Sequence, residues 1–494
     1  MGQFKKLAGD TAIYGTTSIL GRILNWALAP YYSFIFVPEV YAVVSNLYAW
    51  AAFFVVLLLY GMETSYFRYA SKSTEPEKVY STSLISIFFT SFSFVLLAAS
   101  FSGTIARLID YPQHPEYISW FAIILGMDAL TAIPFARLRI NNRPVRFMAI
   151  KMIGIVANIL FNIFFLTFLP WFLGKHPDSF LKFIYSSEIG VGYVFIANLL
   201  SSAITLLLLL PEIVKISLQF DKAVLKKMLN YGFPILIVGL AGVVNQSISF
   251  ILIPFLVPKE LGPMHQLGVY SQGVKLAVLM NMFIQAFRYA FEPFFFSQSS
   301  KSDDSKIYST IMKYFVIFGL IIFLGMVLYL DIIKVIIDEE YHEGLNVVPI
   351  IVMANLFFGI YFTLSLWYKL TDMTRYGAYI SLTGAGISIL LNFLLIPVFG
   401  YMGSAITVFI CFLSMVILSY FLGQKYYPVS YPLKRVFTYF IFATLIYVIS
   451  VFTHKIRPVF EYPANTLLFL SFFGLIYYKE KNELIRLFKI NKKK

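Results

Sequence analysis

Residues 189–210 read IGVGYVFIANLLSSAITLLLLL, a stretch that contains no Asp, Glu, Lys or Arg. At 1.5 Å of rise per residue, a helix of about 20 residues crosses the hydrocarbon core of a bilayer. Backbone groups in lipid must find their hydrogen-bond partners within the protein, so repeated apolar blocks of this length favour helices. The stretch therefore predicts a transmembrane helix.

The same pattern recurs along the chain of 494 residues. We therefore expect an all-α fold, a polytopic integral membrane bundle of about 14 transmembrane helices. The expected spans lie near residues 11–34, 40–62, 81–102, 117–136, 148–170, 189–210, 231–257, 267–290, 308–330, 346–367, 377–396, 403–422, 436–453 and 463–478.

The composition supports a membrane protein and excludes other classes. Hydrophobic residues make up 59% of the chain, charged residues make up 13%, and the mean hydropathy is +0.77. A soluble protein of this length needs a more polar surface than that. The net charge of +14 does not indicate nucleic-acid binding, because most Lys and Arg fall in alternate connections. This is the positive-inside pattern, and it predicts that both termini are cytoplasmic.

Features of enzymes and metal sites are scarce in the sequence. The five His residues fall in outer connections without neighbours at metal-ligand spacing, so we expect no metal. No phosphate-binding Gly-rich loop is present, so we expect neither ATP hydrolysis nor another cofactor. The single cysteine, Cys411, allows no disulfide within the chain. No cleavage site follows the first apolar block, which we expect to remain as a membrane anchor.

The sequence also indicates an internal repeat. Val40-Tyr41 corresponds to Val269-Tyr270, and Arg146-Phe147 corresponds to Arg375-Tyr376 at the same offset. A repeat of six spans predicts two parallel lobes, and such lobes suit alternating access to a central cavity. The expected domains are an N-lobe with helices 1–6 (residues 1–227), a C-lobe with helices 7–12 (228–424), and two further helices with a basic cytoplasmic tail (425–494).

Several short motifs resemble the oligosaccharide flippases of the multidrug/oligosaccharidyl-lipid/polysaccharide superfamily. Each motif is degenerate, and the resemblance lies in their arrangement up to about residue 424. The motifs are Leu20-Gly21-Arg22, Gly61-Met62-Glu63-Thr64 with Arg68, Gly268-Val269-Tyr270, Glu340-Tyr341-His342-Glu343-Gly344 with Val348-Pro349, and Asn392 through Pro397 with Gly400 and Gly403-Ser404-Ala405.

This resemblance implies a function without an enzymatic step. Flippases of this kind move polyprenyl-pyrophosphate-linked oligosaccharides from the cytoplasmic to the outer leaflet of the bacterial inner membrane. The transported units serve the biosynthesis of polysaccharides such as the O-antigen of lipopolysaccharide or a capsule. Membrane lipid and a polysaccharide polymerase are the further partners that the resemblance suggests. It does not imply which glycan is carried.

Two cations within the expected spans suggest a site for the pyrophosphate. Arg22 is placed near the midplane of the first span, and Lys275 lies within the eighth. Charges at such depth cost roughly 2.5–3.5 kcal/mol on insertion scales, so each needs a reason. A guanidinium and an ammonium would together bind a pyrophosphate. The alternatives are that Arg22 pairs with an acid and that Lys275 extends to the membrane surface.

Polar groups at similar depth extend this hypothesis. Asn25, one of several amides within spans, is a candidate for binding sugar hydroxyls, whereas most of the others are expected to join helices. Asp128 is the one acid placed near the midplane, in the same lobe as Arg22. It is either a permanent partner of Arg22, a switch that releases Arg22 to the substrate, or a site for a coupling proton or sodium ion.

Charged residues also mark the cytoplasmic ends of two spans. Glu63 and Arg68 close the second span, and Arg288 and Glu292 close the eighth. Arg288 and Glu292 are four residues apart and can pair on one helix face. The structural interpretation is interfacial packing. The functional interpretation is a cytoplasmic gate that first binds the lipid headgroup.

Two rival functions remain open at this point. A cation-coupled multidrug exporter of the same superfamily would need acids in its cavity, whereas the midplane candidates here are two bases and one acid. A membrane polysaccharide polymerase or glycosyltransferase would need a catalytic cluster on a large outer loop, which this sequence lacks. We therefore favour a flippase.

Overall fold

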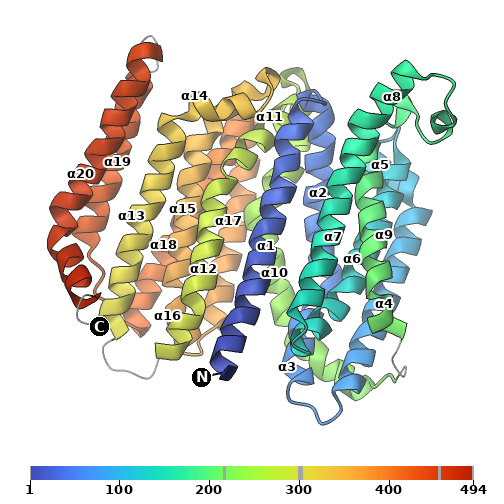
Figure 1. Ribbon diagram of the computed structural model, residues 1–494, viewed down its shortest axis with the longest axis horizontal. Helices are drawn as coiled ribbons and strands as arrows, with labels where there is room; N and C mark the ends of the chain where they lie inside the picture. Colours follow the sequence, from blue (N-terminus) through green and yellow to red (C-terminus); the bar gives the residue numbers. More distant parts are fainter. Residues whose placement is uncertain (1, 215–218, 299–303, 454–457, 492–494) are drawn as a thin grey trace. The chain divides into compact units, whose positions relative to one another are not determined.

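The protein is described here by a computed structural model that covers residues 2–214, 219–298, 304–453 and 458–491 (Figure 1). The chain is 88% helical, and the described residues contain no strand. Within these described ranges, eleven helices are long and apolar enough to cross a membrane, or twelve if a pair bent by 41° counts as one span. The all-α membrane fold predicted from the sequence is thereby confirmed.

The predicted count of about 14 spans is not confirmed. Helix α1 (Gly2–Ser33) covers most of the first expected span and helix α20 (Pro458–Asn491) covers the last, but neither is among the eleven or twelve. The bent pair is α11 (Pro263–Leu276) with α12 (Val278–Gln298), which together cover the eighth expected span.

Contacts between residues divide the chain into two compact units. Unit 1 comprises residues 1–271 and 388–400, and unit 2 comprises residues 272–387 and 401–494. Helix α10 (Lys222–Leu256), which the repeat assigns to the C-lobe, packs against α2, α3 and α4 of unit 1. The arrangement of the two repeat-related lobes, with their boundary at residue 227, stays a prediction.

Proline begins four of the long helices of unit 1. Pro38, Pro76, Pro115 and Pro144 occupy the first helical position, where a backbone N–H would have no partner in any case. Unit 1 contains α1, α10, the start of α11 and the end of α17 (Arg375–Phe399). Its other α-helices are α2 (Pro38–Leu59), α3 (Met62–Ala70), α4 (Pro76–Ser100), α5 (Ser102–Leu108), α6 (Pro115–Ile140), α7 (Pro144–Ile163), α8 (Leu169–Lys175) and α9 (Gly192–Val214).

Asp221 caps the first turn of α10 just outside the apolar segment. Its Oδ1 accepts hydrogen bonds from the backbone N–H groups of Ala223 at 2.8 Å and Val224 at 3.1 Å. Its other oxygen lies 3.1 Å from Lys78 Nζ. The Val224 hydrogen bond and the Lys78 ammonium lower the pKa of the Asp221 carboxyl. The cap therefore stays ionised at neutral pH and favours the positive end of the helix dipole.

Helices α2 and α3 are separated by a break that lies directly against α10. Tyr60 and Gly61 adopt positive φ values of 34° and 73°, which end α2 and redirect the chain. A Cβ on Gly61 would lie 2.4 Å from the backbone oxygen of Gly232, and a Cβ on Gly232 would lie 2.8 Å from that of Tyr60. The two backbones therefore touch, and glycine is required on both sides of this crossing.

The last two helices pack on unit 2 around a buried ion cluster. Glu480 of α20 accepts from Lys313 Nζ of α13 at 2.5 Å and from the Tyr439 hydroxyl of α19 at 2.7 Å. Both charged side chains are almost fully buried, so each charge depends on the other. Unit 2 contains α12, α13 (Asp304–Leu328), α14 (Leu330–Ile333), α15 (Val348–Leu364), α16 (Leu366–Leu370), α18 (Tyr401–Tyr426), α19 (Leu433–Thr453) and α20, and shares α11 and α17 (Arg375–Phe399) with unit 1.

The glycine crossing gives a direct test of packing in unit 1. Gly232→Ala should lower the free energy of unfolding by about 1–3 kcal/mol, because the added methyl group overpacks a backbone contact. Gly242→Ala in the same helix is the matched control, since nothing lies within 4 Å of its Cβ. Unfolding of both variants would be followed by SDS titration in detergent micelles. Equal stability of the two variants would contradict the close crossing.

Candidate functional site

Unit 1 contains a polar cavity of about 300 Å³ between its helices. Helices α1, α2, α6, α7 and α9 contribute to it, and α7 packs against both α1 and α9 (Figure 1). Most of the side chains facing it carry a hydroxyl, amide or charged group. The lining residues are Asn25, Val55, Asp128, Thr131, Phe135, Lys151, Gly154, Ile155, Asn158, Asn198, Ser201, Ser202 and Thr205.

The polar lining follows helical spacing. In α9, four polar residues at positions i, i+3, i+4 and i+7 form one stripe, because such positions share a helix face. In α7, Lys151, Gly154 and Asn158 share a face in the same way. Gly154 allows α7 to approach α9 closely, since a Cβ there would lie 2.5 Å from Thr205 Oγ1. The stripe in α9 consists of Asn198, Ser201, Ser202 and Thr205.

Hydrogen bonds fix part of this lining. The Asn198 amide donates to the Tyr48 hydroxyl at 2.7 Å. The Ser201 and Thr205 hydroxyls donate to backbone oxygens one turn earlier in α9, each at 2.9 Å. Asn25 makes no side-chain hydrogen bond to another described residue. Asn25 lines the cavity, and its predicted role in binding sugar hydroxyls stays a prediction.

Asp128 and Lys151 are the two charged residues that line the cavity. The Asp128 carboxylate accepts a hydrogen bond from the Ser202 hydroxyl at 2.8 Å. The Lys151 ammonium lies 4.2 Å from the centre of the Phe135 ring. The two charges attract each other, but within the described residues no ion pair of 4.0 Å or less joins them. Both side chains are exposed to the cavity.

The sequence-predicted ligands are only partly brought together. Asn25 and Asp128 share the cavity, and Arg22 lies one helical turn before Asn25 with an exposed side chain. Lys275 is also exposed, in the last turn of α11 next to the 41° bend. It belongs to unit 2, so a joint Arg22–Lys275 site stays a prediction. No ion pair between Arg22 and Asp128 is found among the described residues, where Lys151 is the cation that acts on Asp128.

The predicted gate residues of unit 1 have partners that the sequence did not indicate. Glu63 forms an ion pair with Arg139 of α6. The Arg68 guanidinium lies over the ring of Tyr231 in α10, 4.4 Å from its centre. Both contacts join α3 to another helix. They support the interfacial interpretation, and the gating role stays a prediction.

The predicted gate residues of unit 2 are described in part. The Arg288 guanidinium lies 3.9 Å from the centre of the Phe362 ring, and Lys369 lies 4.5 Å from the same ring. The side chain of Glu292 lies outside the described residues, so its predicted pairing with Arg288 is not tested.

Arginines at the α6–α7 connection converge on one buried glutamate. Glu212 of α9 lies 2.6 Å from Arg146, 3.6 Å from Arg143 and 3.8 Å from Arg137. Arg137 also binds Glu77 through one nitrogen, at 2.8 Å and 2.9 Å from its two oxygens. These arginines are therefore part of a network that joins α4, α6, α7 and α9.

Amides within the spans divide into two groups. Asn46 donates to the backbone oxygen of Phe250 at 2.8 Å, Asn162 accepts from the Tyr32 hydroxyl at 2.7 Å, and Asn392 accepts from Ser249 at 3.1 Å. These three join helices, as expected for most amides. Asn25, Asn158 and Asn198 instead line the cavity.

Lys151 and the polar stripe of α9 were missed by the sequence reasoning. Neither Lys151 nor Asn198 was singled out as a candidate ligand. Their signal is periodicity, since a lysine seven residues before Asn158 lies on the same face of the helix. Searching for polar stripes within apolar spans would have found both.

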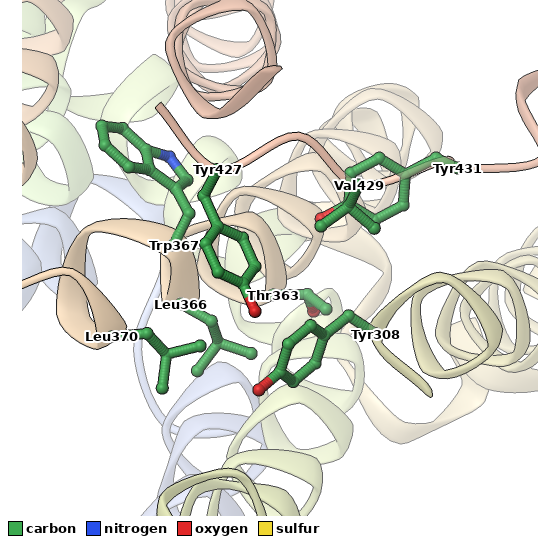
Figure 2. Close-up of a pocket in the computed structure, with 8 residues that line it drawn as sticks. All are labelled: Tyr308, Thr363, Leu366, Trp367, Leu370, Tyr427, Val429 and Tyr431. Carbon is green, nitrogen blue, oxygen red and sulfur yellow. The ribbon is translucent and has the colours of Figure 1, made fainter. Parts of the chain in front are cut away.

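A second hollow lies in unit 2 and is too small for a substrate. Its volume is about 10 Å³, which is close to the space of a single water. Figure 2 shows that aromatic side chains from separate segments surround it, including Tyr308, Trp367, Tyr427 and Tyr431. This aromatic cluster is a packing feature of α13, α16 and the α18–α19 connection.

Comparisons with known proteins decide the family. Residues 7–299 match the family model described as "Polysaccharide biosynthesis protein". The chain belongs to this family. No curated protein matches the sequence.

Solved structures of transporters share the fold of this polysaccharide biosynthesis protein. Lipid II flippase MurJ in an inward closed conformation has a TM-score of 0.72 and 15% identity, with 95% of this chain and 99% of that chain covered. An inward-facing multidrug resistance MATE family transporter of the MOP superfamily has a TM-score of 0.66 and 12% identity, with coverage of 82% and 94%. A point mutant of the Vibrio cholerae MATE transporter VcmN has a TM-score of 0.58 and 14% identity, with coverage of 85% and 96%. At these identities the likeness shows the fold alone, which together with the apolar helices supports a multi-pass membrane protein.

The Glu212 network provides a test of the site's framework. Glu212→Gln should lower the free energy of unfolding by about 1–3 kcal/mol, because three arginines then face a neutral amide. Glu77→Gln is the control, because the Glu77 side chain is 60% exposed and that of Glu212 is 8% exposed. The free energy of unfolding of Glu77→Gln should fall by less than about 1 kcal/mol. SDS titration would measure both. Equal losses would show that the network is not centred on Glu212.

Proposed function

We propose that this protein is a flippase that moves a polyprenyl-pyrophosphate-linked oligosaccharide across a membrane by alternating access. The family match supports a role in polysaccharide biosynthesis, and the fold supports transport. The observation that carries the proposal is the chemistry of the cavity in unit 1, whose lining is dominated by hydroxyl and amide groups.

That lining suits a sugar better than an apolar molecule. Pockets for drug-sized molecules are lined mainly by hydrophobic and aromatic side chains. Here Val55, Phe135 and Ile155 are the larger apolar residues of the lining, and the rest is mostly polar. Sugar hydroxyls both donate and accept hydrogen bonds, and the amides of Asn25 and Asn158 can meet both needs.

The cations Arg22 and Lys275 are the proposed ligands of the pyrophosphate. A guanidinium binds phosphate oxygens with two parallel hydrogen bonds, and an ammonium adds a compact charge. Arg22 is close to the cavity, since it lies one turn from Asn25 on α1. In this proposal Glu63, Arg68, Arg288 and Glu292 stand at the cytoplasmic ends of their spans and admit the headgroup.

The charge pattern supports cytoplasmic termini, and the resemblance to oligosaccharide flippases supports the direction of transport and the location. We infer a multi-pass protein of a bacterial inner membrane with both termini in the cytoplasm, loading substrate there and releasing it to the outer leaflet. O-antigen or capsular units are the proposed cargo, and a polysaccharide polymerase is the proposed consumer of the product. This is transport, with no bond made or broken in the substrate.

A cation-coupled drug exporter is the second candidate. Two observations favour it: the fold is shared with MATE transporters, and Asp128 presents a carboxylate to the cavity. Against it, Lys151 already faces this carboxylate and reduces its attraction for an external cation. The flippase is therefore the better supported function.

Arg22 gives the main test of this proposal. Wild-type protein in proteoliposomes should transfer a fluorescent polyprenyl-pyrophosphate oligosaccharide between leaflets. Arg22→Ala should slow transfer about tenfold or more, because a charge-assisted hydrogen bond contributes about 1.5–3 kcal/mol. Arg22→Lys should retain part of the rate. Ile23→Ala, an exposed neighbour on α1, is the matched control.

Three outcomes would change the conclusion. Full transfer by Arg22→Ala would remove Arg22 from the substrate path. Equal loss in Ile23→Ala would show a general effect on α1. Active uptake of organic cations by a wild type that moves no lipid-linked glycan would establish the exporter instead.

Cysteine labelling in intact cells tests the orientation. Val145→Cys at the α6–α7 connection should resist an impermeant thiol reagent, because that end is proposed to face the cytoplasm. Phe183→Cys between α8 and α9 should be labelled, since its parent side chain is 95% exposed at the other end of α7. The natural Cys411 is buried and should give little background. Labelling of Val145→Cys but not of Phe183→Cys would show the opposite orientation in the membrane.

A further inference from the structure

Lys151 is the one cation among the residues that line the described cavity of unit 1. It lies on α7, on the same face as Gly154 and Asn158, and its side chain is exposed to the cavity. Its ammonium rests over the ring of Phe135 at 4.2 Å. An aromatic ring holds a cation without neutralising it, so the full charge remains available.

Two carboxylates act on Lys151 without bonding to it. Asp128 and Glu63 both attract the ammonium, and Arg139 repels it. Each carboxylate has another partner: Asp128 accepts from Ser202 at 2.8 Å, and Glu63 pairs with Arg139. Among the described residues, no acid lies within 4.0 Å of the ammonium in an ion pair. The two carboxylates are therefore held by other partners and form no ion pair with Lys151 within the described residues.

The surroundings favour an anionic ligand over a neutral one. An ammonium within an apolar helical bundle is costly without a bonded counter-ion, unless a polar or anionic group joins it. The hydroxyls and amides of the cavity can hold a sugar but provide no charge. Phosphate oxygens are strong acceptors for an ammonium, as at other phosphate sites that use lysine.

The geometry points to Lys151 as a binding residue for the phosphate groups that link lipid to glycan. This inference rests on the proposed function and adds a ligand beyond Arg22 and Lys275. Asp128, anchored by Ser202, acts as a positioning residue: it attracts Lys151 in the empty cavity and gives it up to the more highly charged substrate. Asn25, Asn158 and the α9 stripe then bind the first sugar beside the phosphate.

The test compares two lipids that differ in one phosphate. Proteoliposomes would be supplied with a polyprenyl-diphosphate oligosaccharide or with the same oligosaccharide on a polyprenyl monophosphate, and initial transfer rates would give kcat and KM. Lys151→Gln should reduce the preference for the diphosphate, as the ratio of kcat/KM values, by about tenfold. Lys151→Arg should preserve most of the preference. Ile153→Ala, an exposed residue of α7 outside the lining, should behave as wild type.

A double variant separates a ligand from a counter-ion. If Lys151 served only to neutralise Asp128, Lys151→Gln combined with Asp128→Asn would restore the rate and the preference, because neither charge would remain. If Lys151 binds phosphate, the double variant should stay as impaired as Lys151→Gln. Restoration by the double variant, or equal loss for both lipids in Lys151→Gln, would overturn the inference. Unfolding midpoints in detergent would confirm that the variants are folded.

Binding of inorganic pyrophosphate makes the inference independent of transport. Calorimetry with the detergent-purified protein should detect binding to wild type and a loss of about tenfold or more in affinity for Lys151→Gln. Transfer of the glycan lipid with an unchanged preference in Lys151→Gln would reject the inference and leave the flippase intact. If the wild type transfers no glycan lipid but binds pyrophosphate in a way that depends on Lys151, the proposed flippase function would be rejected. The anion-binding site at Lys151 would then still stand. Absence of any difference in pyrophosphate binding would count against Lys151.

Discussion

The free-energy cost of moving a charged side chain out of water is the constraint that determines the described charged contacts. An isolated ion in an apolar bundle costs several kcal/mol, so a charged side chain needs an opposite charge, an aromatic ring or a polar cavity. The structure provides an example of each. Glu480 meets Lys313 and Tyr439 in unit 2, Arg68 rests on Tyr231, and Lys151 opens to the polar cavity. The type of partner then separates structural charges from functional ones.

Fully enclosed charges hold helices together. Glu480 joins three helices of unit 2, and Glu212 joins the ends of α6, α7 and α9 through three arginines. Neither glutamate has room for a ligand, since both are buried by protein atoms. Asp128 and Lys151 differ because each has one weak anchor and a face exposed to the cavity. Exposure to the cavity is thus a better indicator of a ligand site than depth in a span.

The sequence determined the helices but not the partners of the charges. Apolar blocks near 20 residues predicted the spans because length and hydropathy are local properties, and the prolines that begin α2, α4, α6 and α7 reinforce the boundaries. Pairing depends on which helices are neighbours, and a single sequence does not specify that. Asp128 was considered as a partner of Arg22 because the two have similar depth. Lys151, on the helix that packs beside both, was overlooked.

The same limit applies to the glycines. Gly61 was noted as part of a motif, and its positive φ is a local reason for glycine, but its close contact with the backbone of Gly232, far away in the sequence, was not predicted. Such a contact leaves no periodic trace, in contrast to the stripe of Asn198, Ser201, Ser202 and Thr205 in α9. A polar stripe can be recognised in the sequence because an α-helix repeats every 3.6 residues. A helix crossing joins residues without a fixed spacing and cannot be recognised in this way.

The charge balance of the cavity bears on the choice between flippase and exporter. Asp128 and Lys151 contribute one charge of each sign, so the lining as a whole is neutral. A cavity that must attract organic cations would carry an excess of acid, and one that must hold a pyrophosphate needs an excess of base. Arg22, one turn outside the lining, supplies a positive excess on the same helix as Asn25. The neutral pair then has a specific use: Asp128 lowers the cost of an empty cationic site, and its attraction for Lys151 is the barrier that a doubly charged headgroup, but not a neutral glycan, can overcome.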